Sequence, residues 1–263
     1  MNITLIGFGA IAQYVMEQLE NTPHRVSHVI VPSDSLKRYE ANHMGAAKFV
    51  TQLSDVTEDI DLFIDCAGHG GLRDHGLEIL RAGHDLLTVS IGALADAALS
   101  EKLDTAAKEG NGTLHLVSGA IGGLDALRAA RIGALETVRY VGRKPPKGWI
   151  GSPAEGVLDL ANLSTPTPHF SGSAREAAQQ YPKNANVAAA VALSGVGFGA
   201  TQVELIADPN ISQNIHEITA NGDFGQFTFT IEGNPLQANP RTSALAAMSV
   251  IASIHQHAAR MKF

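Results

Sequence analysis

A short glycine pattern near the start of the chain has the residue types needed to hold phosphate groups. The sequence GFGAIA begins at Gly7 and matches G-x-G-x-x-G/A. In this pattern Gly7 permits a tight turn, Gly9 lets the backbone approach a pyrophosphate, and Ala12 lets a helix pack closely on a strand. The phosphates would lie at the helix N-terminus, beside Ala10 and Ile11. We expect a dinucleotide site here; the alternative is a purely structural glycine turn.

The second expected strand, residues 26–31, bears on the choice between NAD and NADP. An NAD-selective site usually has Asp or Glu about 20 residues further on, where it binds the ribose 2′-hydroxyl. This strand ends in VPSDS, which puts no acid at the tip itself and Asp34 nearby. Ser33, Lys37 or Arg38 could accept a 2′-phosphate instead. We therefore expect that both NAD and NADP are used.

Small residues follow two later strands, in the segments CAGH and SGAIGG. Ligands of open α/β sheets bind at the carboxyl ends of the strands, so we expect Ala67 and Gly68 to contact the cofactor. The pair Gly122-Gly123 is also typical of a hinge between domains. We interpret Cys66, inside a strand, as a small buried hydrophobe rather than a nucleophile.

The histidines are ambiguous from pattern alone. His69 is equally a residue at the rim of a site and a loop histidine without a role. His216 stands in an expected strand, where histidines are more often structural than catalytic. His255 and His257 lie two apart on an expected helix and so point to different faces, which argues against a shared metal. We assign no metal, and a single cysteine excludes a thiolate cluster.

Strands alternate with helices through the first 123 residues, which predicts a doubly wound parallel sheet. After Gly123 the pattern changes. A turn-rich KPPKGW and a polar stretch at residues 162–172 precede two strands joined by Asn221-Gly222, a dipeptide typical of a type I′ hairpin. These features indicate a second α+β domain with a mixed or antiparallel sheet and helices on one side. A long helix, residues 243–261, ends the sequence.

Composition narrows the class of function. The chain has 263 residues, 44% hydrophobic and 17% charged, with a net charge of −7. This balance suits one or two globular domains with a small-molecule ligand and argues against nucleic acid. The apolar runs are shorter than the roughly 20 residues of a membrane span. We expect a cytoplasmic protein without a membrane partner.

The segment YPKNANVAAAVALSG places a lysine and two asparagines before a helix of Ala and Val. An asparagine before a helix is typical of an N-cap, and we expect Asn184 to be the cap. The alternative is that these polar side chains face a ligand.

Five segments resemble the L-aspartate dehydrogenases, in order and over nearly the whole chain. They are GFGAIA, DCAGH, SGAIGGLDAL, FSGSAREAAQQYPKNANVAAAVALSG and NPRTSALAA. The resemblance implies a Rossmann domain of residues 1–121 and 239–263. It also implies a substrate domain of residues 122–238, of the kind shared by dihydrodipicolinate reductases and glyceraldehyde-3-phosphate dehydrogenases. The implied reaction is NAD(P)-dependent oxidative deamination of L-aspartate, through iminoaspartate, to oxaloacetate and ammonia. In some organisms the imino product feeds NAD biosynthesis.

The resemblance also implies roles for single residues. Ala120 and Asn186 are expected to contact the cofactor, and His216 is expected to be catalytic. An imidazole that titrates near neutrality suits the two proton transfers of the reaction.

Two substrate carboxylates require donors. The candidates in and before the most similar segment are Thr165, Thr167, His169, Ser171, Ser173, Arg175 and Lys183. We favour Lys183 and Ser173, with Ser171 as a third candidate, because a cation paired with a carboxylate makes a strong contact.

Two other functions fit the same architecture. One is a non-catalytic NAD(P)-sensing protein, which would bind nucleotide without aspartate-dependent turnover. The other is a reductase of the dihydrodipicolinate type, although that family's motif of paired histidines and lysine is not found. A glyceraldehyde-3-phosphate-type enzyme would need a nucleophilic cysteine at the domain junction, and Cys66 lies elsewhere. We also expect a homodimer, paired through the second domain.

Overall fold

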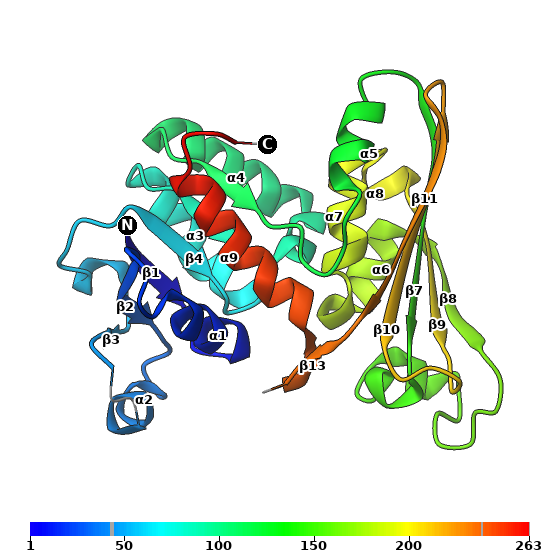
Figure 1. Cartoon of the computed structure of the whole chain (residues 1–263), viewed down its shortest axis with the longest axis horizontal. Coiled ribbons are helices and arrows are strands. Elements are labelled where there is room, and N and C mark those ends of the chain that lie inside the picture. The colour runs from blue at the N-terminus through cyan, green and yellow to red at the C-terminus, as the bar shows by residue number, and fades with distance from the viewer. Residues whose placement is uncertain (43–44, 238, 263) are drawn as a thin grey trace. The chain divides into compact units, whose positions relative to one another are not determined.

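The computed structural model describes residues 1–42, 45–237 and 239–262. The chain forms two compact units, which Figure 1 shows coloured from blue to red along the sequence. The first unit is Met1–Val117 with Ala247–Phe263, and the second is Ser118–Ala246.

The first unit contains a six-stranded parallel sheet in the order β3-β2-β1-β4-β5-β6. Its strands are β1 (Asn2–Ile6), β2 (Arg25–Ile30), β3 (Lys48–Val50), β4 (Leu62–Asp65), β5 (Leu86–Thr88) and β6 (Leu114–Leu116). The order reverses between β1 and β4, which is the topological switch point where doubly wound sheets bind ligands. The predicted doubly wound parallel sheet is confirmed.

Helices cover both faces of this sheet (Figure 1). They are α1 (Ala10–Leu19), α2 (Leu36–Asn42), α3 (His69–Arg81), α4 (Ala97–Gly110) and α9 (Ala244–Ala258), with short 3-10 turns at Leu53–Asp55 and Ile91–Ala95. The Asp96 carboxylate caps α4 by accepting from the backbone N–H groups of Ala98 and Leu99, at 3.1 and 3.2 Å.

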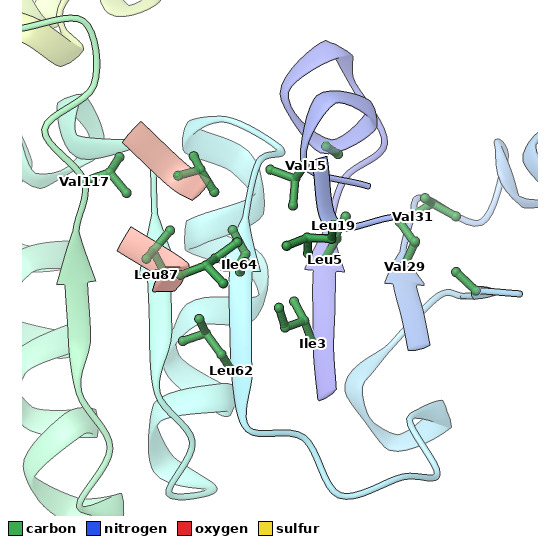
Figure 2. Close-up of a cluster of buried hydrophobic side chains, with 14 of the residues drawn as sticks. Ile3, Leu5, Val15, Leu19, Val29, Val31, Leu62, Ile64, Leu87 and Val117 are labelled. Carbon is green, nitrogen blue, oxygen red and sulfur yellow. The ribbon is translucent and has the colours of Figure 1, made fainter. Parts of the chain in front are cut away.

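The core of the first unit lies between the strands of this sheet and the helices α1 and α9. Ile3 and Leu5 of β1 point to one side, where they pack with α1 and with Val250 and Ile254 of α9. Figure 2 shows the matching side chains of the neighbouring strands, Val29, Leu62, Ile64 and Leu87. Sheets buried on both sides need such continuous apolar strands.

The second unit contains a five-stranded mixed sheet in the order β11-β10-β7-β9-β8. Its strands are β7 (Leu135–Lys144), β8 (Thr167–Ser173), β9 (Gln202–Ala207), β10 (Asn214–Gly222) and β11 (Gly225–Gly233). The pair β7–β9 is parallel and the other pairs are antiparallel. The predicted second domain with a mixed sheet is therefore confirmed.

Helices of the second unit lie on one face of this sheet (Figure 1). They are α5 (Leu124–Ala130), α6 (Ala174–Gln180), α7 (Asn186–Ser194) and α8 (Gly197–Ala200). Three 3-10 turns, η3 (Pro146–Trp149), η4 (Pro153–Gly156) and η5 (Pro182–Asn184), connect the elements, and β12 (Pro235–Leu236) pairs with β13 (Asn239–Ser243).

Two local features differ from the sequence reading. The polar stretch at residues 162–172, where no strand was predicted, contains most of β8, an edge strand that begins at Thr167. The predicted hairpin turn at Asn221-Gly222 is wrong: Gly222 still pairs with Gly225, so the turn residues are Asp223 and Phe224. A side chain at Gly222 would lie 2.3 Å from the Ala134 carbonyl oxygen, so its glycine serves close packing inside the strand.

Within the described ranges, the structure contains no helix both long enough and apolar enough to cross a membrane.

Candidate functional site

The two glycines of the GFGAIA loop are required for different reasons. Gly7 has φ +83, and a Cβ there would lie 2.8 Å from both Cα and Cβ of Ala67. Gly9 has an ordinary φ of −86, and a Cβ there would meet nothing within 4 Å. Gly7 therefore lets the turn pack against Ala67, which lies just after β4. Gly9 instead keeps space open in front of the helix. That open space is what a pyrophosphate close to the backbone requires.

Helix α1 begins directly behind this space. Ala10 and Ile11 are in its first turn, where backbone N–H groups have no acceptor within the helix. The first regular helical bond joins the N–H of Gln13 to the carbonyl of Gly9, at 3.0 Å. Ala12 is fully buried, as close packing of helix on strand requires. The loop and helix terminus together fit a phosphate group.

A buried carboxylate shapes the neighbouring loop after β4. One oxygen of Asp65 accepts from the backbone N–H of Ala67 at 3.0 Å, and the other accepts from the Thr88 hydroxyl at 2.7 Å. Burial raises the pKa of Asp65, and these hydrogen bonds oppose the rise. Gly68 follows with φ +80 and is the N-cap of α3. Ala67 and Gly68 thus lie at the carboxyl end of β4, beside the glycine loop.

Cys66 is unsuited to nucleophilic chemistry. Burial, followed by the charge of Asp65, raises the pKa of its thiol, which disfavours the thiolate. Cys66 packs against the core of the first unit, as expected, but it directly follows β4 rather than lying inside a strand, and it is only partly buried.

The region after β2 contains the groups considered for a 2′-phosphate. Ser33 and Lys37 are exposed. The Arg38 guanidinium lies 4.8 Å from the centre of the Tyr39 ring. Phe8, Arg38 and Tyr39 also line a cavity of about 660 Å³ in the first unit.

Gly7→Ala and Gly9→Ala are expected to have opposite consequences. Gly7→Ala should destabilise the chain by about 1–3 kcal/mol, because alanine is strained at this φ and contacts Ala67. Gly9→Ala should leave the melting temperature of the nucleotide-free protein unchanged and weaken nucleotide binding about tenfold or more, a loss of ~1.4 kcal/mol. Thermal unfolding and nucleotide titration of both variants check this. Equal destabilisation by the two substitutions would contradict these roles.

The second unit contains a polar cluster centred on His216. His216 lies on β10 directly opposite Gly142 of β7, and Tyr140 is on the same face of β7 as Gly142. The Tyr140 hydroxyl lies 2.8 Å from Nδ1 of His216. A Cβ at Gly142 would lie 2.7 Å from that hydroxyl oxygen, so the glycine makes room for the contact.

Lys144 extends this cluster along β7. It is two residues after Gly142 and so lies on the same face of the strand. Its ammonium group donates to Oδ1 of Asn184 and lies 5.1 Å from the centre of the Trp149 ring. Trp149 is fixed in turn, because its indole N–H donates to the Ile206 carbonyl at 3.1 Å.

Burial controls the charges in this cluster, which we call the His216 cluster (Tyr140, Lys144, Asn184 and His216). Burial, reinforced by the positive charge of Lys144, lowers the pKa of His216 to about 3. Burial also lowers the pKa of Lys144 to about 8 and raises that of Tyr140. At neutral pH the imidazole is therefore an uncharged proton acceptor beside a cation.

His169 lies next to the same region, where it contacts the aromatic side chains of Trp149 and Tyr181. Its ring lies 4.3 Å from that of Trp149, and its Nδ1 is 3.1 Å from the Tyr181 hydroxyl. Burial lowers the pKa of His169 to about 4.

The segment 182–186 does not cap helix α7 as expected. The N-cap of α7 is Ala185, which has no side-chain cap, and the Asn184 amide oxygen accepts from Lys144 instead. The prediction of Asn184 as the cap is wrong, because Asn184 ends the 3-10 turn Pro182–Asn184 and Ala185 lies between it and α7. Asn186 is the first residue of α7. The side chain of Lys183 lies outside the part of the chain that the structure describes.

The remaining predicted residues occupy distinct places. Ser171 is an exposed residue of the edge strand β8. Ser173 is the N-cap of α6, where its hydroxyl accepts from the N–H of Glu176 at 3.3 Å in a capping box. Ala120 is nearly buried between β6 and α5, three residues before Gly123, the N-cap of α5.

Sequence reasoning missed Tyr140 and Lys144. Their signal was the spacing of alternate residues in a strand, which puts Tyr140, Gly142 and Lys144 on one face. That spacing becomes informative only when the register places His216 opposite Gly142.

The first unit and its glycine loop define a class of protein. A family model described as the NAD-binding domain of homoserine dehydrogenase matches residues 7–117. With the second mixed-sheet unit, this defines a two-domain dehydrogenase that uses a pyridine nucleotide. A second family model, described as aspartate dehydrogenase, C-terminal, matches residues 125–257.

Full-length relatives identify the family. An L-aspartate dehydrogenase of Ruegeria pomeroyi is 52% identical over 100% of this chain and 94% of its own length. One from Pseudomonas aeruginosa is 48% identical over 98% of both. The crystal structure of aspartate dehydrogenase from Thermotoga maritima superposes with a TM-score of 0.79 at 26% identity, covering 100% of this chain and 99% of that one. The chain belongs to the L-aspartate dehydrogenase family.

Proposed function

We propose that this chain catalyses the NAD(P)-dependent oxidative deamination of L-aspartate to oxaloacetate and ammonia. The observation that carries the proposal is the His216 cluster: an uncharged imidazole next to a lysine that can pair with a carboxylate. Family membership supports the same reaction. We propose further that residues 1–121 with 239–263 bind the nucleotide and that residues 122–238 bind the substrate.

The nucleotide contacts in this proposal are Gly7, Gly9, Ala10, Ile11, Ser33, Ala67, Gly68, Ala120 and Asn186. The phosphates would be held by the loop and first turn of α1, where Gly9 leaves open space. A nucleotide held there would supply the acceptor for the hydride that leaves Cα of the substrate.

His216 is proposed as the general base. For Nε2 to accept a proton, Nδ1 must carry hydrogen and donate to the Tyr140 oxygen, at 2.8 Å. His216 would take a proton from the substrate ammonium, so that hydride leaves Cα while the amine is neutral. After releasing that proton to solvent, His216 would take another from the water that attacks the iminium carbon. The two substrate carboxylates would raise the low pKa of His216 toward the working range.

Lys144 is proposed as a carboxylate-binding residue, in addition to Ser171, Ser173 and Lys183. In the structure its ammonium group donates a hydrogen bond to the amide oxygen of Asn184, which carries no charge. A substrate carboxylate would place a negative charge beside this ammonium group, which favours the protonated form of Lys144. Ser173 is the weaker candidate of the predicted three, since its hydroxyl is engaged in the α6 cap.

Tyr140→Phe is expected to lower kcat about 2- to 12-fold, the effect of losing one neutral hydrogen bond of ~0.5–1.5 kcal/mol. Tyr140 is a positioning residue, so nucleotide binding should not change. Gly142→Ala should act in the same direction, because its Cβ would displace the Tyr140 hydroxyl. The check is kcat and the pH profile of kcat for both variants. A wild-type pH profile in both would show that Tyr140 does not orient His216.

Both NAD and NADP are proposed as cofactors. Arg38→Ala should lower kcat/KM for NADP⁺ about tenfold, as expected for loss of ~1.4 kcal/mol of contact to the 2′-phosphate, and leave the value for NAD⁺ nearly unchanged. Lys102→Ala, at an exposed position on α4, is the control and should leave both values unchanged. A wild-type preference above about a hundredfold for either cofactor, roughly 2.7 kcal/mol, would reject dual use.

A substrate panel tests the proposed reaction. Formation of reduced cofactor is followed with L-aspartate, D-aspartate, L-glutamate and L-alanine, each with NAD⁺ and NADP⁺. The proposal predicts turnover with L-aspartate well above the others. A non-catalytic nucleotide sensor would bind the cofactor and reduce none of it with any amino acid.

We also propose that the protein works in the cytoplasm, where its cofactor is available, and as a homodimer. Light scattering after size-exclusion chromatography tests the dimer. A mass of one chain at micromolar concentration would reject it.

A further inference from the structure

Three side chains of types that can bind a metal ion lie close together in the first unit, on the side of the parallel sheet that α9 covers. Asp85 directly precedes β5, His115 is the middle residue of β6, and His257 is in the last turn of α9. Asp85 is two residues before Leu87, and Leu87 pairs with His115. All three strand residues therefore point to the same face. Leu87 packs there with Val250 and Ile254 of α9.

The ligand atoms are close enough to surround one ion. Oδ2 of Asp85 lies 3.3 Å from Nε2 of His115 and 3.9 Å from Nε2 of His257. All three ligand atoms lie within 4.8 Å of one another. The two imidazole rings meet edge to face, with centroids 5.2 Å apart.

The carboxylate is held in place by the backbone. Its other oxygen, Oδ1, accepts from the N–H of Thr113 at 2.8 Å. The carbonyl of Asp85 accepts from the N–H of Phe63 at 3.0 Å. Asp85 thus presents Oδ2 toward both histidines, and such fixed outer contacts are typical of metal-binding carboxylates.

We propose that Asp85, His115 and His257 bind one Zn²⁺ ion. Two imidazole nitrogens and one carboxylate oxygen suit zinc, whereas Ca²⁺ and Mg²⁺ prefer all-oxygen sites. Ligands bound to a tetrahedral zinc at ~2.0–2.2 Å lie about 3.4 Å apart. The Asp85–His115 pair is already at this spacing, and Nε2 of His257, at 3.9 Å from Oδ2 of Asp85, would have to move closer. The side chains are 21–37% exposed, which leaves access for a water as the fourth ligand.

The proposed ion would tie α9 to β5 and β6. Asp85 directly precedes β5, whereas the glycine loop follows β1. In a parallel sheet the two therefore lie at opposite ends of the strands. The zinc site is therefore independent of the proposed reaction, and its expected effect is on stability.

The test uses the full chain after removal of any affinity tag. The protein is treated with EDTA, desalted, and titrated with zinc chloride by calorimetry, and its thermal unfolding is measured with and without zinc. One zinc per chain and a higher melting temperature are expected, because an ion that binds only the folded chain stabilises it. His257→Gln should weaken zinc binding more than about 100-fold, since losing an outer partner alone costs ~10–100-fold.

His255→Gln is the matched control on the same helix. Its ring lies near His24 instead, with centroids 6.1 Å apart, so zinc binding should stay at the wild-type value. His115→Gln provides a second ligand variant. Failure of the wild type to take up zinc would overturn the proposal. So would zinc binding that survives both His257→Gln and His115→Gln, or that is lost in His255→Gln.

Discussion

Replacing His216 with alanine is expected to lower kcat for aspartate oxidation by about 10²–10⁴-fold, the usual contribution of a general acid–base group. The physical reason is the state of this side chain: burial and the Lys144 charge keep it uncharged, and Tyr140 fixes its Nδ1. Nucleotide affinity should stay close to wild type. The measurements are steady-state kcat with saturating cofactor and aspartate, and nucleotide titration of the same preparation.

Glu217→Gln is the matched control for this variant. Glu217 follows His216 on β10 and points to the opposite face of the sheet. It should retain wild-type kcat, so that a loss specific to His216 can be separated from damage to the strand. Unchanged kcat in His216→Ala would sink the assignment of His216 as the base.

Lys144→Met is expected to raise KM for aspartate by about 10- to 150-fold, the effect of losing a charged hydrogen bond of ~1.5–3 kcal/mol. The change should fall mainly on KM, because Lys144 is assigned to binding rather than to proton transfer. Folding stability should not suffer, since a methionine removes a buried cation without leaving a charge behind. Lys147→Met, an exposed lysine in the adjoining turn, is the control. A Lys144→Met enzyme with wild-type KM would exclude the carboxylate contact.

The same assignment predicts a pH dependence. Burial places the pKa of Lys144 at about 8 in the unliganded chain, so its ammonium is lost as the pH rises through 8. A dicarboxylate without an amino group, such as succinate, should therefore inhibit less strongly above pH 8, about tenfold per pH unit. In the unliganded chain His216 has a pKa near 3 and does not titrate in this range. The inhibition constant of Lys144→Met should not show this dependence.

The first unit could be predicted because its signals are local. A strand, the GFGAIA loop and a helix follow one another within the first 19 residues, and the burial of Ala12 and openness at Gly9 are the properties that the pattern requires. His216 was accessible only through the family resemblance. The residues that flank His216 in the sequence form an ordinary strand, and their spacing does not indicate a catalytic site.

The His216 cluster could not be assembled from sequence because it depends on strand register. Tyr140 and Lys144 are 76 and 72 positions before His216, and only the β7–β10 pairing brings them together. The strand β8 was missed because an edge strand of polar residues lacks an apolar alternation; its Pro168 is tolerated at an edge. The shifted hairpin turn likewise follows from a tertiary contact, between Gly222 and Ala134.

The most direct test of the proposed function is the stoichiometry of the products. The purified chain is incubated with L-aspartate and either NAD⁺ or NADP⁺, and reduced cofactor, ammonia and oxaloacetate are quantified in the same sample. The proposal predicts equal amounts of all three, with production sharply reduced in His216→Ala. Bound nucleotide without any reduced cofactor or ammonia, at high enzyme concentration with both cofactors, would contradict it.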